Sequence, residues 1–206
     1  MSQFNDKLDS IAEKIRQDFL AKDAAREKAL PLCRESIRYS SLAIRAIHRR
    51  EFDSAQDKID KARQLINEAE NSLSAWSQLH NVSWNAQKEF AEASITLAVI
   101  TDKELPTPDE LGTEYAAYLN GLGEAIGELR RYLLDSIRGG DLSQGEGLLQ
   151  AMDDAYNVLV TMDFPDTITG GLRHTTDMVR GVLERTRSDL TLAIRQKKLE
   201  EKLEGK

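Results

Sequence analysis

The stretch FDSAQDKIDKARQLINEAENSLSAW, residues 52–76, decides the fold class of this chain. Its apolar and small residues follow one another at steps of three and four: Phe52, Ala55, Ile59, Ala62, Ile66, Ala69, Leu73 and Trp76. This spacing places them on one face of an α-helix, which completes a turn every 3.6 residues or so (about 100° per residue). Such a seam favours packing along a neighbouring helix, and its alanines allow close approach.

Helical spacing continues on both sides of this seam. Apolar residues at three- and four-residue steps predict a helix from Phe4 to about Arg50. We expect a break or kink near Ala29–Leu30, because Pro31 lacks a backbone donor and clashes with the preceding turn. Further helices are predicted over about 84–100, from 109 or 113 to 138, around 148–159, and from 172 to beyond 198.

No useful length of the chain alternates with the period of a strand. We therefore expect an all-α protein in which residues 1–206 form a single domain, a bundle of about six to seven helices. The charged tail at about 198–206 is expected to fray.

Composition narrows the class of protein further. The 206 residues carry a net charge of −7, which argues against a protein coated in basic charge for DNA but allows a local basic face. The single cysteine, Cys33, excludes an internal disulfide framework. The chain shows no secretory leader and no apolar run of roughly 18 residues, so we expect a cytoplasmic protein without membrane contact.

Basic residues gather on one face of the first predicted helix. Arg34, Arg38, Arg45 and Arg49 fall within roughly 60° of one another on a helical wheel, and His48 lies beside them. A row of arginines could follow a phosphate backbone, because charge neutralisation supplies most of the affinity for nucleic acid. The same row could instead be a solvated face that pairs with acids on a neighbouring helix.

Acidic pairs stand at helical spacing in the middle of the chain. Glu89 and Glu92 are three residues apart beside an apolar stripe, and Glu124 and Glu128 are four apart. Helix-borne carboxylates of this kind can bind one cation, and Mg²⁺ or Mn²⁺ prefers oxygen ligands. Each pair could also be an ordinary charged helix flank. Asp141 reads as a helix cap, and Ser143 to Glu146 as a capping box.

Three segments of the chain resemble the translin family, and within it the branch of translin-associated factor X. They are YLNGLGEAIGELRRYLLDSIRGGDLS at 118–143, QKEFAEA at 87–93 and REKALPLCRESIRYSSLAIRAIHRRE at 26–51, and the likeness spans roughly residues 25–195. The resemblance implies about seven helices and a hollow octamer that encloses single-stranded or short duplex nucleic acid. Factor X subunits are metal-dependent endoribonucleases, whereas translin-type subunits bind nucleic acid and lack the full carboxylate cluster.

The likeness carries over to individual positions. Glu89 and Glu92 match the catalytic glutamates of factor X, and Glu124 stands where that branch also has an acid. The sequence departs from the factor X pattern after the Gly-Asp turn. Ser143 occupies the position of an acid, and the next acid aligns with Gly147, one residue after Glu146.

These observations lead to one hypothesis and two alternatives. The leading hypothesis is a metal-dependent endoribonuclease that acts on single-stranded or short duplex RNA inside a homo-oligomeric shell, an octamer. The alternatives are a translin-like protein that binds single-stranded RNA or DNA without cutting it, and a helical scaffold without nucleic acid. The catalytic residues of the leading hypothesis are Glu89, Glu92, Glu128 and Asp141. The ligands of Mg²⁺ or Mn²⁺ are Glu89, Glu92, Glu124 and Glu128. The nucleic-acid contacts are Arg34, Arg38, Arg45, His48 and Arg49.

Overall fold

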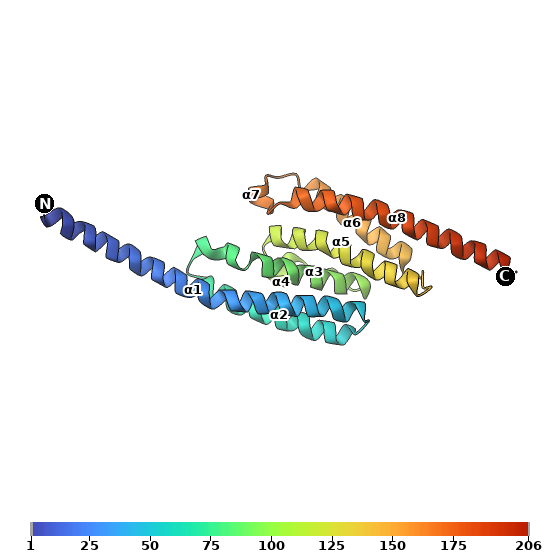
Figure 1. Cartoon of the computed structure of the whole chain (residues 1–206), viewed down its shortest axis with the longest axis horizontal. Coiled ribbons are helices and arrows are strands. Elements are labelled where there is room, and N and C mark those ends of the chain that lie inside the picture. The colour runs from blue at the N-terminus through green and yellow to red at the C-terminus, as the bar shows by residue number, and fades with distance from the viewer. Residues whose placement is uncertain (1, 206) are drawn as a thin grey trace.

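The computed structural model describes residues 2–205, and side chains from Phe4 to Gly205. Every element in that range is a helix, which confirms the all-α prediction (Figure 1). The elements are α1 (Ser2–His48), α2 (Phe52–Leu73), the 3₁₀ helix η1 (Ser77–Val82), α3 (Trp84–Ile100), α4 (Pro108–Leu111), α5 (Tyr115–Arg138), α6 (Gly145–Thr161), α7 (Asp166–Thr169) and α8 (Leu172–Leu203).

The long helices pack side by side in a fixed order. The second half of α1 forms an antiparallel hairpin with α2, α3 and α5 lie in the middle, and α6 and α8 cover the other side (Figure 1). Phe90 of α3, Ile126 of α5 and Ile47 of α1 are among the fully buried side chains. The central pair α3 and α5 is therefore enclosed by helices from both ends of the chain.

The seam of residues 52–76 is buried from Ala55 to Leu73 as its spacing predicts, whereas Phe52 and Trp76 at its two ends are half-buried. Ala55, Ile59, Ala62 and Ile66 are buried against the core, and the Ser36 hydroxyl of α1 donates a hydrogen bond to the Ala62 carbonyl at 3.1 Å. That contact is possible because alanine leaves the α2 backbone accessible to α1. The helix ends at Leu73 rather than at Trp76, and η1 follows it.

Of the break or kink expected near Ala29–Leu30, the break is wrong, because α1 runs without interruption through Pro31. The carbonyl that proline leaves without a partner is that of Glu27, four residues earlier. Both Pro31 and Glu27 are exposed, so water can take the missing hydrogen bond. Figure 1 shows a gentle change of direction between the outer half of α1 and the half packed on α2.

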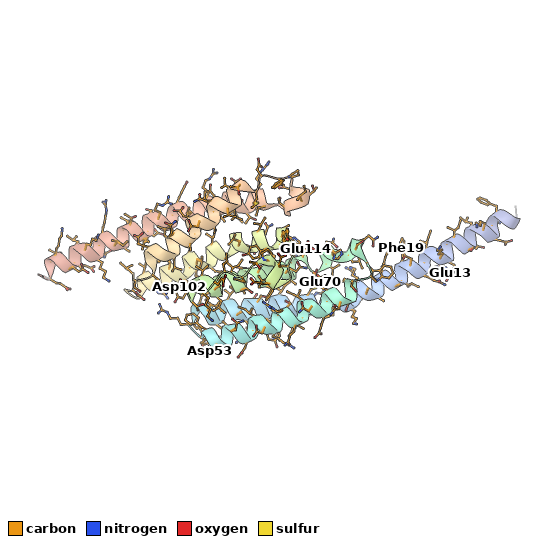
Figure 2. All side chains as sticks on the ribbon, turned by 180° about the vertical axis from the view of Figure 1, so that it is seen from behind. Glu13, Phe19, Asp53, Glu70, Asp102 and Glu114 are labelled. Carbon is orange, nitrogen blue, oxygen red and sulfur yellow. The ribbon has the colours of Figure 1, made fainter. Side chains whose placement is uncertain are left out.

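The first half of α1 extends beyond the bundle, away from the other helices (Figure 1). Its apolar face is uncovered, with Phe4 71% and Phe19 63% exposed, and Leu8, Ile11 and Ile15 also exposed. Figure 2 shows Phe19 and Glu13 on this projecting part. We call these five apolar residues, Phe4, Leu8, Ile11, Ile15 and Phe19, the arm stripe.

Two helix starts differ from their sequence predictions. The capping box predicted at Ser143 is not formed, because Asp141 Oδ1 accepts hydrogen bonds from the Ser143 backbone N–H at 3.0 Å and its hydroxyl at 2.7 Å. The residue before α6 is Gln144, and its side chain makes no capping bond. A capping box forms instead between Thr107 and Glu110 at the start of α4.

The last helix continues into the region expected to fray. It remains α-helical to Leu203, so the structure places regular backbone over most of the charged tail. Within residues 2–205, none of the helices combines the length and the apolar character that crossing a membrane requires.

Candidate functional site

A glycine sets the spacing between the two central helices. An added Cβ at Gly121 of α5 would lie 2.7 Å from the Lys88 carbonyl and 2.9 Å from the Cβ of Ala91, both on α3. Real side chains do not tolerate contacts this short, so glycine is the residue that permits this approach. Because α5 comes this near at Gly121, the next turn of α5 carries Glu124 against the same part of α3.

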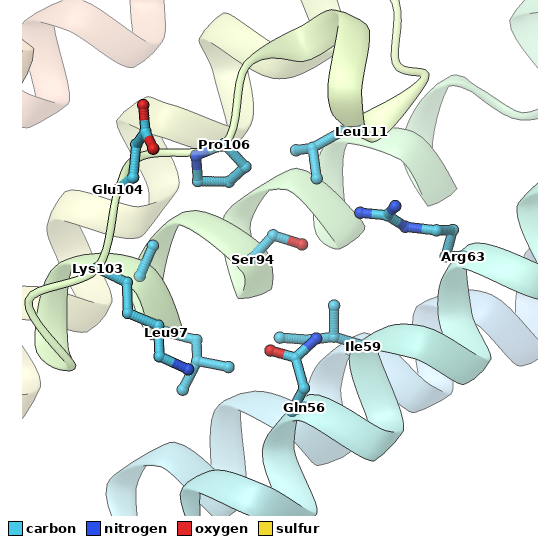
Figure 3. A pocket seen from close by; sticks show the side chains of 10 residues that line it. Gln56, Ile59, Arg63, Ser94, Leu97, Lys103, Glu104, Pro106 and Leu111 are labelled. Carbon is cyan, nitrogen blue, oxygen red and sulfur yellow. The ribbon is translucent and has the colours of Figure 1, made fainter.

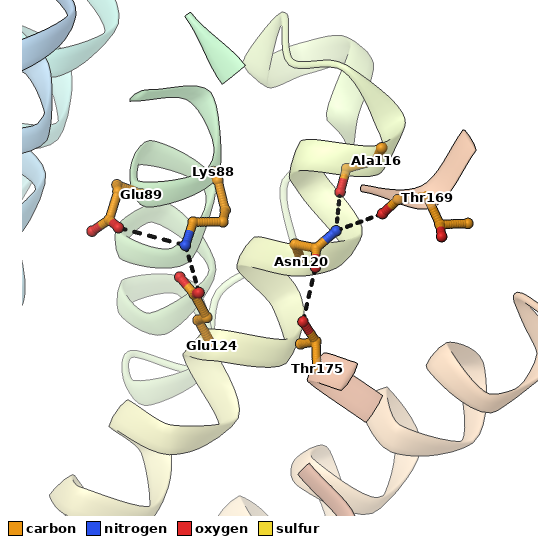
Figure 4. A network of polar contacts seen from close by, with 7 residues as sticks. All are labelled: Lys88, Glu89, Ala116, Asn120, Glu124, Thr169 and Thr175. Carbon is orange, nitrogen blue, oxygen red and sulfur yellow. Dashed lines mark hydrogen bonds and ion pairs between the residues drawn. The ribbon is translucent and has the colours of Figure 1, made fainter. Parts of the chain in front are cut away.

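Three carboxylates meet where these helices approach one another. Glu89 and Glu92 of α3 and Glu124 of α5 each offer an oxygen, and the three oxygens lie within 4.8 Å of one another. We call these residues the glutamate cluster. Lys88 joins it, with its Nζ 2.5 Å from Glu124 Oε1 and 3.7 Å from Glu89 Oε1 (Figure 4). The predicted pairing of two glutamates on one helix with an acid from another is therefore present.

A hydrogen-bond network fixes the helix behind the cluster. The Asn120 amide nitrogen donates to the carbonyls of Ala116 and Thr169 at 2.8 Å, and its oxygen accepts from the Thr175 hydroxyl at 2.9 Å (Figure 4). These bonds tie α5 to α7 and α8 one residue before Gly121. Glu124 is thus carried on a helix whose position is held from both sides.

The cluster holds negative charge in a poorly hydrated place. Burial, together with the charges of Glu89, Glu124 and Glu128, raises the pKa of Glu92 to about 8, and Lys88 opposes this only in part. Burial also raises the pKa of Glu89, against the opposing effect of Lys88. Nearby like charges and desolvation both disfavour ionisation. A bound cation would remove this cost, which makes the cluster a candidate cation site.

Glu128 lies beside the cluster and is held by histidine. His48 Nε2 is 2.5 Å from Glu128 Oε2, and Arg131 Nη1 lies 3.7 Å from the same oxygen. Glu128 is one of the charges that raise the pKa of Glu92, although it does not join the group of three close oxygens. Only 7% of the His48 side chain is exposed, so most of it faces protein rather than any nucleic acid outside.

Asp141 is not brought to the cluster. It is exposed in the turn after α5. The last residue of that helix, Arg138, is ten residues beyond Glu128, which corresponds to a rise of roughly 15 Å along the helix axis. Its hydrogen bonds from Ser143 lower its pKa, with a smaller contribution from Arg50 at 4.0 Å. The geometry therefore gives Asp141 the role of a turn residue.

The predicted basic face of α1 is exposed along its length. Arg38 pairs with Glu35 at 2.5 Å and Arg49 with Glu51 at 3.1 Å, both within their own stretch of chain. For Arg34 and Arg45, no acid lies within ion-pair distance among the residues that the structure describes. Within residues 4–205, none of the four arginines therefore pairs with an acid on a neighbouring helix, whereas His48 beside them contacts Glu128 of α5.

The pocket shown in Figure 3 lies elsewhere. It has a volume of about 160 Å³ between α2, α3 and the segment before α4, and Arg63, Ser94 and Lys103 are among its lining residues. Ser94 projects about 140–160° away from Glu89 and Glu92 around the α3 axis, at about 100° per residue. This pocket is therefore separate from the glutamate cluster.

The donor set of the cluster fits a small divalent cation. Mg²⁺ binds oxygens at about 2.1 Å in an octahedron, so adjacent ligand oxygens stand about 3 Å apart. The oxygens of Glu89, Glu92 and Glu124 lie within 4.8 Å of one another, which small side-chain rotations can reduce. Sequence reasoning missed Lys88 and Gly121. The only signal for either was the glycine pair around Leu122, at residues 121 and 123.

Comparisons with known proteins agree with this architecture. The solved structure of AfC3PO in complex with duplex RNA superimposes with a TM-score of 0.82 and 32% identity, covering 90% of this chain and 97% of AfC3PO. A second AfC3PO crystal structure gives a TM-score of 0.76 and 30% identity over the same shares. Apo-NeC3PO shares the fold at a TM-score of 0.79 and 16% identity, with 88% and 96% covered.

One curated protein sequence is also similar. The uncharacterized protein MJ0175 of Methanocaldococcus jannaschii is 33% identical over 184 residues, which is 88% of this chain and 82% of that protein. No protein-family model matches the chain. The extent of the match to AfC3PO, in both sequence and fold, shows that this chain belongs to the translin and C3PO family of all-α proteins.

Proposed function

We propose that this protein is an RNA-binding endoribonuclease of the factor X type that depends on Mg²⁺ or Mn²⁺. The observation that carries the proposal is the meeting of three half-buried carboxylates from α3 and α5. One of them is Glu92, whose pKa is raised to about 8. Glu89, Glu92 and Glu124 would hold the ion, with Glu128 beside them. When bound, such an ion supplies an activated water and neutralises charge on the phosphate.

RNA is the partner that the basic face of α1 favours. AfC3PO, the relative with 32% identity, has been solved with duplex RNA. Arg34 and Arg45 are exposed and have no acid within ion-pair distance in residues 4–205, so both can contact phosphates without first breaking an ion pair. We propose that Arg38 and Arg49 extend this contact along a single strand or a short duplex, and single-stranded DNA offers the same phosphates.

We further propose a homo-oligomer, an octamer in the form that the family resemblance implies. The arm stripe supports it, because five large apolar side chains on a helix that leaves its own bundle are best covered by another subunit. Light scattering at micromolar concentration tests the proposal. Leu8→Asp with Ile15→Asp should lower the mass, whereas Ser10→Asp with Gln17→Asp, on the opposite face of the same arm, should leave it unchanged. A monomeric wild type would overturn the oligomer.

One observation favours the second candidate, a translin-like protein that binds RNA without cutting it. The Lys88 ammonium lies 2.5 Å from Glu124 and 3.7 Å from Glu89, so a cation of the protein itself already neutralises part of the cluster. A metal ion must displace this ammonium or share the carboxylates with it. If it cannot, the cluster is an internal ion pair and the arginine face acts alone.

The deciding experiment uses labelled single-stranded and short duplex RNA with purified protein. Wild type, Glu89→Gln and Glu184→Gln are compared in Mg²⁺, in Mn²⁺ and in chelator. Glu184 is an exposed acid on α8, and its variant controls for the change in charge. Metal-dependent cleavage by wild type and Glu184→Gln but not by Glu89→Gln would support the nuclease. Equal, salt-sensitive binding by all three without cleavage would select the binding protein.

A further inference from the structure

The polar contact between His48 and Glu128 joins two helices that are distant in the chain. His48 is the last residue of α1, and Glu128 lies in the middle of α5, eighty positions later. The Nε2 and Oε2 atoms are 2.5 Å apart. Where the Glu128 carboxylate is ionised it can only accept a hydrogen bond, and His48 Nε2 is then the donor of this contact. The bond is therefore a specific, directed contact rather than a general electrostatic attraction.

The surroundings of His48 allow its ring little freedom. Its side chain is 7% exposed, and the ring centroid lies 6.5 Å from that of Tyr132, which is itself buried. The second ring nitrogen, Nδ1, is buried and has no hydrogen-bond partner in the described part of the chain. Burying an unpaired polar atom costs free energy. The ring is thus kept in this orientation by its packing and by the single bond to Glu128.

The contacts of Glu128 are one-sided. Both His48 and Arg131 approach Oε2, and no contact to Oε1 is found among residues 4–205. Glu128 stands one helical turn beyond Glu124 on α5, so the two side chains share a face of that helix. Its charge already acts on Glu92 across the gap to α3. The carboxylate is therefore anchored at one oxygen, at the margin of the glutamate cluster.

We infer that His48 is a positioning residue that holds Glu128 in place as the fourth carboxylate of the cation site. This inference rests on one part of the proposed function, namely that the glutamate cluster binds a divalent cation. A free glutamate side chain samples several rotamers and would lose that freedom on binding an ion. A carboxylate that is already anchored loses less, and outer partners of this kind commonly change metal affinity by about 10- to 100-fold.

The role differs from the one that the arginine row suggested for His48. A nucleic-acid contact needs an accessible donor, whereas Nε2 is engaged by Glu128 and Nδ1 is buried. Arg45 of α1 and Arg49, in the turn directly after it, are exposed instead. The end of α1 therefore presents Arg45 outward and His48 inward, where the histidine contacts Glu128 of α5.

The test measures Mn²⁺ binding to the full chain by titration calorimetry, and by the electron paramagnetic resonance of free Mn²⁺. His48→Leu removes the donor while filling the space, and His48→Gln restores a donor amide. Glu128→Gln and the double variant with His48→Leu complete a cycle. Thermal unfolding of each metal-free variant reports folding separately, and Lys28→Leu, at an exposed position of the same helix, is the control.

The expected result is a loss of Mn²⁺ affinity by about tenfold or more in His48→Leu, with most of it recovered in His48→Gln. The double variant should bind no more weakly than Glu128→Gln alone, because the two residues act as one unit. Wild-type affinity in folded His48→Leu, or additive losses in the double variant, would overturn the inference. A purely structural contact would lower the unfolding temperature in His48→Leu without this pattern of affinities.

The failure of this inference can be told apart from the failure of the proposed function. Wild-type protein that binds Mn²⁺ and leaves RNA uncut would overturn the nuclease while leaving the role of His48 standing. Wild-type protein that cuts RNA with Mn²⁺ but shows no effect of His48→Leu on Mn²⁺ affinity would overturn the role of His48 alone. Absence of Mn²⁺ binding by the wild type would overturn both.

Discussion

Two acidic regions that look alike in the sequence occupy different environments in the structure. Glu89, Glu92 and Glu124 are half-buried between α3 and α5, where burial and mutual repulsion raise the pKa of Glu92 to about 8. Asp141 is exposed in the turn before α6, where hydrogen bonds from Ser143 lower its pKa. Acids of the first kind cost stability unless something neutralises them, whereas Asp141 is stabilised by its own turn. Only the first region calls for a ligand.

The strongest test of this contrast removes the most buried acid of the cluster. Glu92→Gln keeps the size of the side chain but removes a carboxyl group that can ionise to bind the cation. We expect Mn²⁺ affinity to fall by about 100-fold or more, because a lost ligand costs more than a lost outer partner. Titration calorimetry measures this, with Glu184→Gln as the control. Unchanged affinity would show that the cluster does not bind the ion.

The second test uses pH. The pKa of Glu92 is about 8 in the folded protein against an ordinary 4.5, so the folded state retains a proton that the unfolded state releases between these values. The free energy of unfolding of the metal-free protein should therefore be greatest below about pH 4.5 on this account and decline as the pH rises through about 8.

Denaturant unfolding in chelator, at several values across this interval, checks the decline. Glu92→Gln should flatten the dependence, and Glu184→Gln should leave it as in the wild type. If Glu92→Gln keeps the pH dependence of the wild type, that dependence comes from other groups. The glutamate cluster would then not be the source of the lost stability.

The third test asks whether Lys88 competes with a bound cation. Its ammonium lies 2.5 Å from Glu124, so an incoming ion meets a charge that opposes it. Lys88→Met should tighten Mn²⁺ binding by about tenfold at low salt and lower the unfolding temperature of the metal-free protein. Lys61→Met, on the exposed side of α2, is the control. Weaker binding in Lys88→Met would mean that lysine supports the site instead of occupying it.

The smallest effect is expected at Asp141. Asp141→Asn preserves a side-chain oxygen that can accept the two bonds from Ser143 and removes only the charge. Mn²⁺ affinity and RNA cleavage should stay within about twofold of the wild type, as for most surface substitutions. A large loss of cleavage with unchanged Mn²⁺ affinity would bring this turn into the active site through a contact with RNA. Steady-state cleavage rates on one RNA substrate decide between these outcomes.

Helical periodicity predicted the framework of this protein well. The bounds expected for α3, 84–100, are those of the structure, and the seam of α2 is buried at the predicted positions from Ala55 to Leu73. Such predictions succeed because burial of one face repeats with the turn of the helix. Pro31 and the start of α6 were predicted wrongly. At each, a local rule was applied without knowing whether water or a competing side chain would satisfy the backbone.

The site was predicted in part. The helical wheel placed Glu89 and Glu92 together, and the resemblance singled out Glu124 and Glu128, but neither could rank Asp141 below them. That ranking depends on which helices touch, and the sequence holds no direct record of the contact between Gly121 and Ala91. Lys88 and His48 gained their neighbours from the same packing. Their contacts with Glu124 and Glu128 join residues that are far apart in the sequence, so no local sequence pattern predicts them.

The missing side chain of Gly121 has a consequence for how such sites are found in other sequences. A search that matches acids alone would also accept chains with a side chain at the glycine position. Even a methyl group there would hold the two helices too far apart for their carboxylates to share an ion. Glycine three positions before the acid, as at Gly121 and Glu124, reports the distance between the helices as well as their chemistry. A search that also requires this glycine would test the spacing between the helices as well as the presence of the acids.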